Sequence, residues 1–189
     1  MIRVWDPLVR SLHWLLAASV LAAWTSGHGL SRWFDEIHHI AGYLAVFAVV
    51  VRTVWGFVGA RHARFGQFVR SPRATWVYAR QLRARCEPRY IGHNPLGGWM
   101  VLVLLVTVAC LSLSGFLYTT DWLWGYAWLS DLHATLAWVI LGLVLGHVAG
   151  VVLMSLRHGE NLVAAMLHGR KRAARSGDID HALHKERQA

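Results

Sequence analysis

The sequence predicts an all-α integral membrane protein built as a four-helix bundle. Hydrophobic residues make up 56% of the 189-residue chain and charged residues only 15%, whereas a soluble domain has about 45–50% and about 25%. Four segments are almost free of charge over about 20 residues, which is the length that a helix needs to cross about 30 Å of hydrocarbon. None of them shows the period-2 alternation of a membrane β-strand.

The positions of the charged residues locate the four predicted spanning helices. No Asp, Glu, Lys or Arg occurs between Arg10 and Arg32, or between Asp131 and Arg157. Between Glu87 and Asp121 only Arg89 is charged, and the segment from Ile37 to Val58 contains one charged residue, Arg52. We place the helices at about residues 9–27, 37–58, 97–118 and 132–156.

The distribution of Lys and Arg predicts the orientation of the chain in its membrane. Residues 61–98 hold eight Arg and one acid, Glu87, and residues 157–189 hold seven Lys or Arg. Basic segments stay on the cytoplasmic side, so both termini and the loop at residues 61–96 are expected there. This bias accounts for the formal net charge of +9, and we expect no nucleic-acid partner.

Two segments outside the predicted spans are expected to form an interfacial helix and a polar tail. Residues 67–85 place Trp76 and Tyr78 among several arginines, which predicts a helix that lies in the membrane interface. Residues 173–189 are polar and are expected to form a flexible cytoplasmic tail. The transmembrane domain is therefore expected to cover residues 1–172.

Histidines inside the predicted spans are candidate functional residues, because a titratable side chain within a membrane is energetically costly. His133 and His147 both lie in the fourth predicted helix. Their spacing corresponds to about 21 Å along the helix and about 40° around it, so both face one side. His13 lies at the depth of His147, and His38 or His39 lies at the depth of His133. The pattern predicts two histidine pairs at two depths in one bundle.

Two imidazoles from opposite helices suit the two axial positions of a haem iron, and helix bundles commonly hold cofactors in their interior. Because protein fills both positions, no iron site stays open for oxygen or substrate, and such a haem carries single electrons. Zinc fits less well, since two imidazoles do not complete a tetrahedral site. One membrane histidine often only bonds a neighbouring helix, but four histidines matched in depth favour two stacked b-type haems.

Arg52 is a further candidate for a haem site. It follows His38 at the same spacing at which His147 follows His133, which places it at the depth of His13 and His147. It is either the cation that pairs with a haem propionate or an arginine that snorkels to the interface, and the sequence favours neither. Glycines at the same helix faces leave room for a flat macrocycle or allow close helix packing, which is their commoner use; they are Gly42, Gly142, Gly146 and Gly150.

Several motifs taken together resemble the bacterial cytochrome b561 family, which includes the b-type cytochrome subunits of nickel–iron hydrogenases. The resemblance covers about residues 1–172, and the set is specific although no single motif is. The motifs are Arg10-Ser-Leu-His13-Trp14, His38-His39-Ile-Ala-Gly42-Tyr43, Arg52-Thr-Val-Trp-Gly56, Gly92-His-Asn-Pro-Leu-Gly-Gly98-Trp99, Leu132-His133 and His147-Val-Ala-Gly150-Val151.

The resemblance implies a membrane four-helix bundle with two haem b groups, whose axial ligands come from the first, second and fourth helices. The family motif places a glycine four residues after the ligand of the second helix, so His38 rather than His39 is the expected ligand. His13 and His147 would bind the haem near the cytoplasm. His38 and His133 would bind the haem near the outer side.

The expected function is electron transfer across the membrane between a periplasmic redox partner and the quinone pool. Family likeness names a cytochrome c, superoxide or a dehydrogenase subunit as the periplasmic partner, with quinone and membrane lipid as the others. One alternative is a cytochrome b subunit that anchors a periplasmic oxidoreductase or hydrogenase. A remote alternative is a haem-free transporter or scaffold that uses the histidines for protons or metal.

Overall fold

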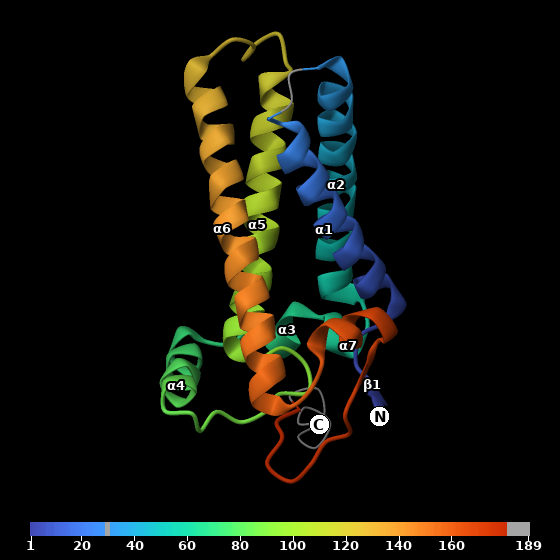
Figure 1. The fold of residues 1–189 in the computed structure, drawn as a ribbon, viewed down its shortest axis with the longest axis vertical. Coiled ribbons are helices and arrows are strands. Elements are labelled where there is room, and N and C mark those ends of the chain that lie inside the picture. Colours follow the sequence, from blue (N-terminus) through green and yellow to red (C-terminus); the bar gives the residue numbers. More distant parts are fainter. Residues whose placement is uncertain (29–30, 181–189) are drawn as a thin grey trace. The chain divides into compact units, whose positions relative to one another are not determined.

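The structure is a computed structural model, and it describes residues 1–28 and 31–180. Four of its helices are long and apolar enough to cross a membrane, namely α1, α2, α5 and α6 (Figure 1). This confirms the predicted number of spans. In chain order the elements are β1 (Ile2–Arg3), α1 (Pro7–Ser26), α2 (Arg32–Val58), the 3₁₀-helix η1 (Arg61–Ala63), α3 (Phe65–Phe68), α4 (Pro72–Arg83), α5 (Pro95–Tyr118), α6 (Ala127–His158), α7 (Leu162–His168) and β2 (Arg170–Lys171).

Two of the spanning helices are longer than the charge-free segments that predict them. α2 starts at Arg32 rather than at residue 37, and α6 starts at Ala127 rather than at residue 132. The added turns contain charged residues, including Asp35 in α2 and Asp131 in α6. A charged side chain is costly in hydrocarbon but not on a helix that continues beyond it. The number of consecutive residues without charge therefore predicts the length of helix inside the membrane and not the full length of the helix.

The chain divides into two compact units, and each is made of segments that are distant in the sequence. The terminal unit, as we name it, comprises Met1–Arg10, Val54–Leu102 and Gly146–Ala189. The span unit comprises Ser11–Thr53 and Val103–Leu145. Each of the four spanning helices contributes residues to both units.

The span unit has an apolar core to which all four of its helical segments contribute. Its buried residues come from α2, α5 and α6, and partly buried residues of α1 pack against them. Most of the buried apolar side chains on α2 are alanines, so neighbouring helices can approach closely, as is usual for helix contacts in membranes. The core comprises Ala45, Val49, Val108 and Ile140, with Leu16, Val20, Leu104, Leu105, Leu111 and Val144 around it.

In the terminal unit the beginning of the chain pairs with a segment near its end. β1 and β2 are antiparallel, with Ile2 opposite Lys171. The backbone N–H groups of Val4 and Trp5 donate to the carbonyl of Gly169. Gly169 ends α7 with a φ of 78°, and a Cβ atom there would lie 2.6 Å from the Trp5 carbonyl oxygen. Only glycine satisfies both the left-handed backbone and this close approach.

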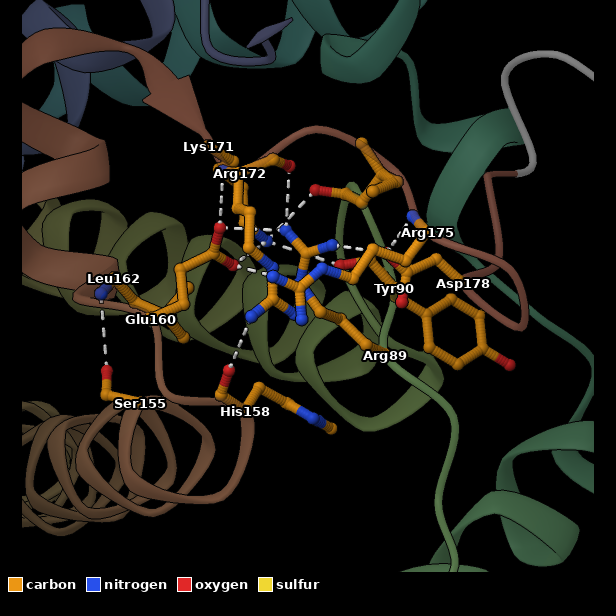
Figure 2. Close-up of polar contacts among 11 residues, drawn as sticks. Arg89, Tyr90, Ser155, His158, Glu160, Leu162, Lys171, Arg172, Arg175 and Asp178 are labelled. Atoms are coloured by element: carbon orange, nitrogen blue, oxygen red, sulfur yellow. Dashed lines mark hydrogen bonds and ion pairs between the residues drawn. The ribbon is translucent and has the colours of Figure 1, made fainter. Parts of the chain in front are cut away.

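A buried ion cluster in the terminal unit joins the loop before α5 to the segments that follow α6 (Figure 2). The Arg89 side chain is 4% exposed and forms ion pairs with Glu160, at an Nη2–Oε1 distance of 2.8 Å, and with Asp178. Lys171 Nζ lies 3.5 Å from Glu160 Oε2. The backbone of Ile179 bonds that of Arg89, at an N–O distance of 2.8 Å. The predicted tail is therefore held at Asp178 and Ile179.

The remaining residues of the predicted tail, 181–189, lie outside the described residues. Their flexibility stays a prediction. Within the loop at residues 61–96, the structure places the predicted interfacial segment as the short helix α3 and the longer helix α4. Phe68 and Tyr78 of this segment are each 2% exposed, whereas Trp76 is 67% exposed. The aromatic side chains therefore point in different directions instead of forming one apolar face.

Candidate haem-binding site

His38 of α2 and His133 of α6 lie beside each other in the span unit. Their ring centroids are 6.0 Å apart, and their ring planes are inclined at 68°. Two imidazoles that bind one metal from opposite sides, each at a metal–nitrogen distance of about 2 Å, have centroids roughly 6 Å apart. Rotation of either ring about the shared axis leaves that distance unchanged. The separation thus fits two axial ligands of one haem iron.

The hydrogen bonds of this pair leave the same nitrogen of each ring available. His38 Nδ1 lies 2.8 Å from the carbonyl oxygen of Ala23 in α1. A carbonyl only accepts, so Nδ1 of His38 carries the proton and Nε2 keeps its lone pair. A histidine held in this way by its other nitrogen is oriented for metal binding.

His133 is held in the same way by a serine of α5. Its Nδ1 lies 3.0 Å from Ser114 Oγ, and that hydroxyl also lies 2.9 Å from the Leu111 carbonyl oxygen. Because the hydroxyl has one proton, which it donates to Leu111, it accepts from the Nδ1–H of His133. Nε2 of His133 therefore also keeps its lone pair.

Each ring of the pair also rests against a glycine. A Cβ atom at Gly115 of α5 would lie 2.9 Å from Cε1 of His133, and one at Gly27 would lie 3.2 Å from the His38 ring. The first distance is shorter than a side chain tolerates without displacement. These two glycines, like Ser114, were not among the candidates taken from the sequence. The only signal for Ser114 and Gly115 is a pair of small residues within a long apolar segment.

The span unit provides space on the helix that carries His38. A Cβ atom at Gly42, one turn after His38, would meet no described atom within 4 Å, and the same holds for Gly142 of α6. Close helix packing, the commoner use of such glycines, therefore does not occur at these two positions among the described residues. The open space next to a histidine pair suits a flat macrocycle.

The other expected ligands are distributed over the two units. His13 lies in the span unit and His147 in the terminal unit, and both are half-buried. Their pairing stays a prediction. His39 is exposed, whereas its neighbour His38 is half-buried. Of these two adjacent histidines, His38 is the one that lies beside His133.

Arg52 is 6% exposed and lies on α2 in the span unit. A snorkelling arginine extends its head away from the protein into water, so this burial argues against that interpretation. A buried guanidinium is stable when an anion or several acceptors surround it. Its role towards a haem propionate stays a prediction.

The described residues contain no group of three or more His, Cys, Asp or Glu that could hold a metal ion by themselves. Histidines outside the predicted pairs have other surroundings. His93 lies in the terminal unit with its ring centroid 4.7 Å from that of Trp5 and 4.5 Å from that of Phe68. His28 Nδ1 lies 2.8 Å from the carbonyl oxygen of Trp24.

Comparison with known proteins points to b-type cytochromes. The chain is similar to the "Probable Ni/Fe-hydrogenase B-type cytochrome subunit" of Rhizobium leguminosarum bv. viciae, with 23% identity over 89% of this chain and 87% of the relative. It is similar to the proteins of the same name from Azotobacter vinelandii and Azotobacter chroococcum mcd 1, each with 26% identity over 72% of this chain and 66% of the relative. No solved structure matches the chain.

The family comparison covers most of the sequence. The pattern of the prokaryotic cytochrome b561 family matches residues 4–169. That range begins just after β1 and ends at the glycine that follows α7, so it includes all four spanning helices and the His38–His133 pair. The chain therefore belongs to the prokaryotic cytochrome b561 family and is a multi-pass membrane cytochrome of the b type.

Proposed function

We propose that the protein carries electrons across the bacterial inner membrane by means of two haem b groups. The observation that supports this most directly is the His38–His133 pair, with ring centroids 6.0 Å apart and both Nδ1 atoms engaged in hydrogen bonds. When bound, haem b supplies one-electron transfer. His38 and His133 would hold this haem from both sides, so oxygen and substrates would be excluded from its iron.

The second haem is proposed to lie between His13 and His147. Both histidines are half-buried on membrane-spanning helices, and their depth along these helices matches in the sequence. Arg52 is proposed as the cation that pairs with a propionate, since its side chain is buried and a charge-assisted bond to a carboxylate would stabilise it.

The electron partners are proposed from the expected topology and from the family. With both termini and the loop at residues 61–96 in the cytoplasm, the His38–His133 pair is near the periplasmic side. A periplasmic redox partner would exchange electrons there, and quinone would exchange them within the membrane. Cytochrome c, superoxide and a dehydrogenase subunit remain candidates for the periplasmic partner.

A second candidate function is that of a subunit in a larger oxidoreductase. It is favoured by the names of the relatives, which are probable Ni/Fe-hydrogenase B-type cytochrome subunits. In this case the chain would anchor a hydrogenase or another periplasmic oxidoreductase and accept its electrons. Affinity purification in mild detergent distinguishes the two functions. A stoichiometric large partner supports the subunit, and a cytochrome that purifies alone supports the independent carrier.

A reduced-minus-oxidised absorption spectrum of the purified protein tests the main proposal. We expect a b-type α band and, by the pyridine haemochrome assay, two haems per chain. Absence of the α band would end the electron-transfer proposal and favour the remote alternative of a haem-free transporter or scaffold. One haem per chain would contradict the proposal of two sites, and the histidine substitutions below would show which pair binds it.

Histidine substitutions assign the ligands. His38→Ala and His133→Ala should each remove the same haem, whereas His13→Ala and His147→Ala should each remove the other. His39→Ala is the matched control, because His39 is adjacent to His38 and exposed, and it should leave both haems. If His39→Ala removes a haem and His38→Ala does not, the assignment is wrong.

A further inference from the structure

Helix α4 presents a basic and aromatic face to the solvent. Trp76, Arg80 and Arg83 follow each other at intervals of four and three residues, which places them on one side of the helix. All three are exposed, and together with Ala84 they line a groove. Tyr78, on the opposite side of α4, is 2% exposed. One side of α4 is therefore packed against the protein, and the other side faces the solvent.

Contacts with two membrane-spanning helices hold α4 within the terminal unit. The Tyr78 hydroxyl lies 3.6 Å from Sδ of Met154, near the end of α6. Arg157 Nη1, also near the end of α6, lies 2.9 Å from the carbonyl oxygen of Leu82. Before α4, the indole nitrogen of Trp99 in α5 lies 3.0 Å from the Arg70 carbonyl oxygen. These partners lie near an end of each spanning helix, so α4 is held at the membrane boundary.

The positive charge of this surface is not cancelled by nearby acids. α4 contains no Asp or Glu, and Glu87 is the one acid between residues 61 and 96. Glu87 is engaged by Arg157, with an Oε1–Nη1 distance of 3.0 Å. Arg73 is a further exposed cation of α4. An anion that approaches the groove thus meets arginines and an indole ring.

We propose that the groove lined by Trp76, Arg80, Arg83 and Ala84 binds the headgroup of an anionic phospholipid. Arginine forms paired hydrogen bonds with phosphate oxygens. Tryptophan is favoured at the level of the headgroups, where one part of its ring is in contact with lipid and its N–H with water. The exposed Val77 beside Trp76 adds apolar surface at the same place.

The placement of α4 favours a lipid over other anionic partners. A nucleic acid or an acidic protein would bind arginines equally well in water, but it would gain little from Trp76 and Val77 at the membrane boundary. An anionic lipid satisfies both the charged and the apolar groups of the groove. This proposal does not depend on the number of haems or on the identity of the electron donor.

Lipid binding by the full-length, haem-loaded protein in detergent tests the proposal. Native mass spectrometry measures the binding of phosphatidylglycerol and, separately, of phosphatidylcholine at matched acyl chains. We expect phosphatidylglycerol to bind more tightly. In Arg80→Gln/Arg83→Gln its dissociation constant should rise roughly 10- to 30-fold, with no change for phosphatidylcholine. Arg3→Gln/Arg170→Gln is the matched control, because it removes the same charge from two exposed residues of β1 and β2.

Several results would overturn the proposal. The first is equal binding of the two lipids. The second is an unchanged dissociation constant for phosphatidylglycerol in Arg80→Gln/Arg83→Gln. The third is an equal loss of phosphatidylglycerol affinity in the control Arg3→Gln/Arg170→Gln. Displacement of phosphatidylglycerol by millimolar inorganic phosphate, or tighter arginine-dependent binding of a single-stranded oligonucleotide, would assign the surface to another ligand. Trp76→Ala provides a second test with all arginines present. This variant should weaken the binding of phosphatidylglycerol several-fold, and an unchanged dissociation constant would also overturn the proposal.

Discussion

Ser114 is the residue on which the orientation of His133 depends. Its hydroxyl accepts the Nδ1–H of His133 at 3.0 Å, so Ser114→Ala removes this hydroxyl partner of the ring. Loss of such a partner typically lowers metal affinity by about 10- to 100-fold. We therefore expect one of the two proposed haems to be released more readily, as measured by haem transfer to apomyoglobin.

The control for this variant is Thr107→Val. Thr107 is also a buried hydroxyl residue of α5, but its hydroxyl bonds Val103 of its own helix, at 2.8 Å. It should leave the release of both haems unchanged. If Ser114→Ala and Thr107→Val behave alike, the hydrogen bond to His133 does not support a cofactor.

Gly115 is expected to be intolerant of even one added methyl group. In Gly115→Ala the new Cβ would lie 2.9 Å from Cε1 of His133, so the ring or α5 must shift. We expect the haem content to fall from two towards one per chain, measured by the pyridine haemochrome assay. Gly66→Ala is the control, since Gly66 lies in α3, outside the spanning helices, and its Cβ would meet nothing within 4 Å. This variant should retain both haems.

At the residue scale the sequence identified the histidines but not what surrounds them. His38 and His133 stand out because titratable groups are costly within a membrane. Ser114 and Gly115 do not, since small residues occur throughout helix interfaces in membranes. Arg52 is open to two interpretations in the sequence, and its burial in the structure, at 6% exposed, argues against the snorkelling one. The contacts between helices determine which residues surround the histidines and whether Arg52 is buried, and a single sequence does not show these contacts.

At the scale of elements, the packing of α2 against α3 depends on Gly56. A Cβ atom at Gly56 would overlap the ring of Phe65, so Gly56→Ala forces the aromatic ring to move. Overpacking of this kind costs about 1–3 kcal/mol. The thermal unfolding midpoint in detergent should therefore fall by several degrees. Gly66→Ala in α3, where a Cβ would meet nothing within 4 Å, should leave the midpoint unchanged or slightly higher.

The elements differ in how well the sequence predicts them. Long apolar segments predict the spans, because the membrane demands about 20 helical residues whatever surrounds them. The start of α5 at Pro95 is also readable, since proline suits the first helical position and Asn94 accepts a hydrogen bond from the Gly97 N–H at 2.7 Å. The two-residue strands β1 and β2 were not predicted, because they exist only through their pairing across most of the chain.

At the scale of the whole molecule, the ion cluster around Arg89 makes stability depend on pH. Burial alone would raise the pKa of Glu160, but hydrogen bonds from Arg89 and the Arg172 backbone, with the charge of Lys171, hold this pKa below its usual value. The pKa of Asp178 is lowered too, against the effect of burial, by bonds from the Arg175 backbone and from Arg89. Both carboxylates therefore stabilise the folded state above about pH 4, their ordinary range.

This stabilisation should be lost as the pH falls through the lowered pKa values. Glu160→Gln removes one charge and leaves Arg89 and Lys171 incompletely compensated, which costs about 3–5 kcal/mol near neutral pH. Unfolding midpoints measured from pH 7 to pH 3 should decline steeply in the wild type and less steeply in Glu160→Gln. Glu36→Gln is the control, because Glu36 is exposed. A wild-type unfolding midpoint that does not change between pH 7 and pH 3 would contradict the prediction.

The expected topology is tested with the cysteines of the chain. Cys86 is exposed in the loop at residues 61–96, and Cys110 lies in α5. In a Cys110→Ser background, a membrane-impermeant maleimide should label Cys86 in inverted vesicles but not in intact spheroplasts. With Cys86→Ser and Asp121→Cys added, labelling should occur in spheroplasts instead. The reverse pattern would show that the distribution of arginines misplaces the chain.

The pairing of β1 with β2 has a consequence for biosynthesis. Residues 2–5 are synthesised before the four spanning helices, whereas their partners, Gly169 and Lys171, are synthesised after them. During synthesis β1 therefore stays unpaired until all four spanning helices have been made. The terminal unit closes only after residue 171 has been made, so a product truncated before that residue retains an unpaired strand edge that quality-control proteases can recognise.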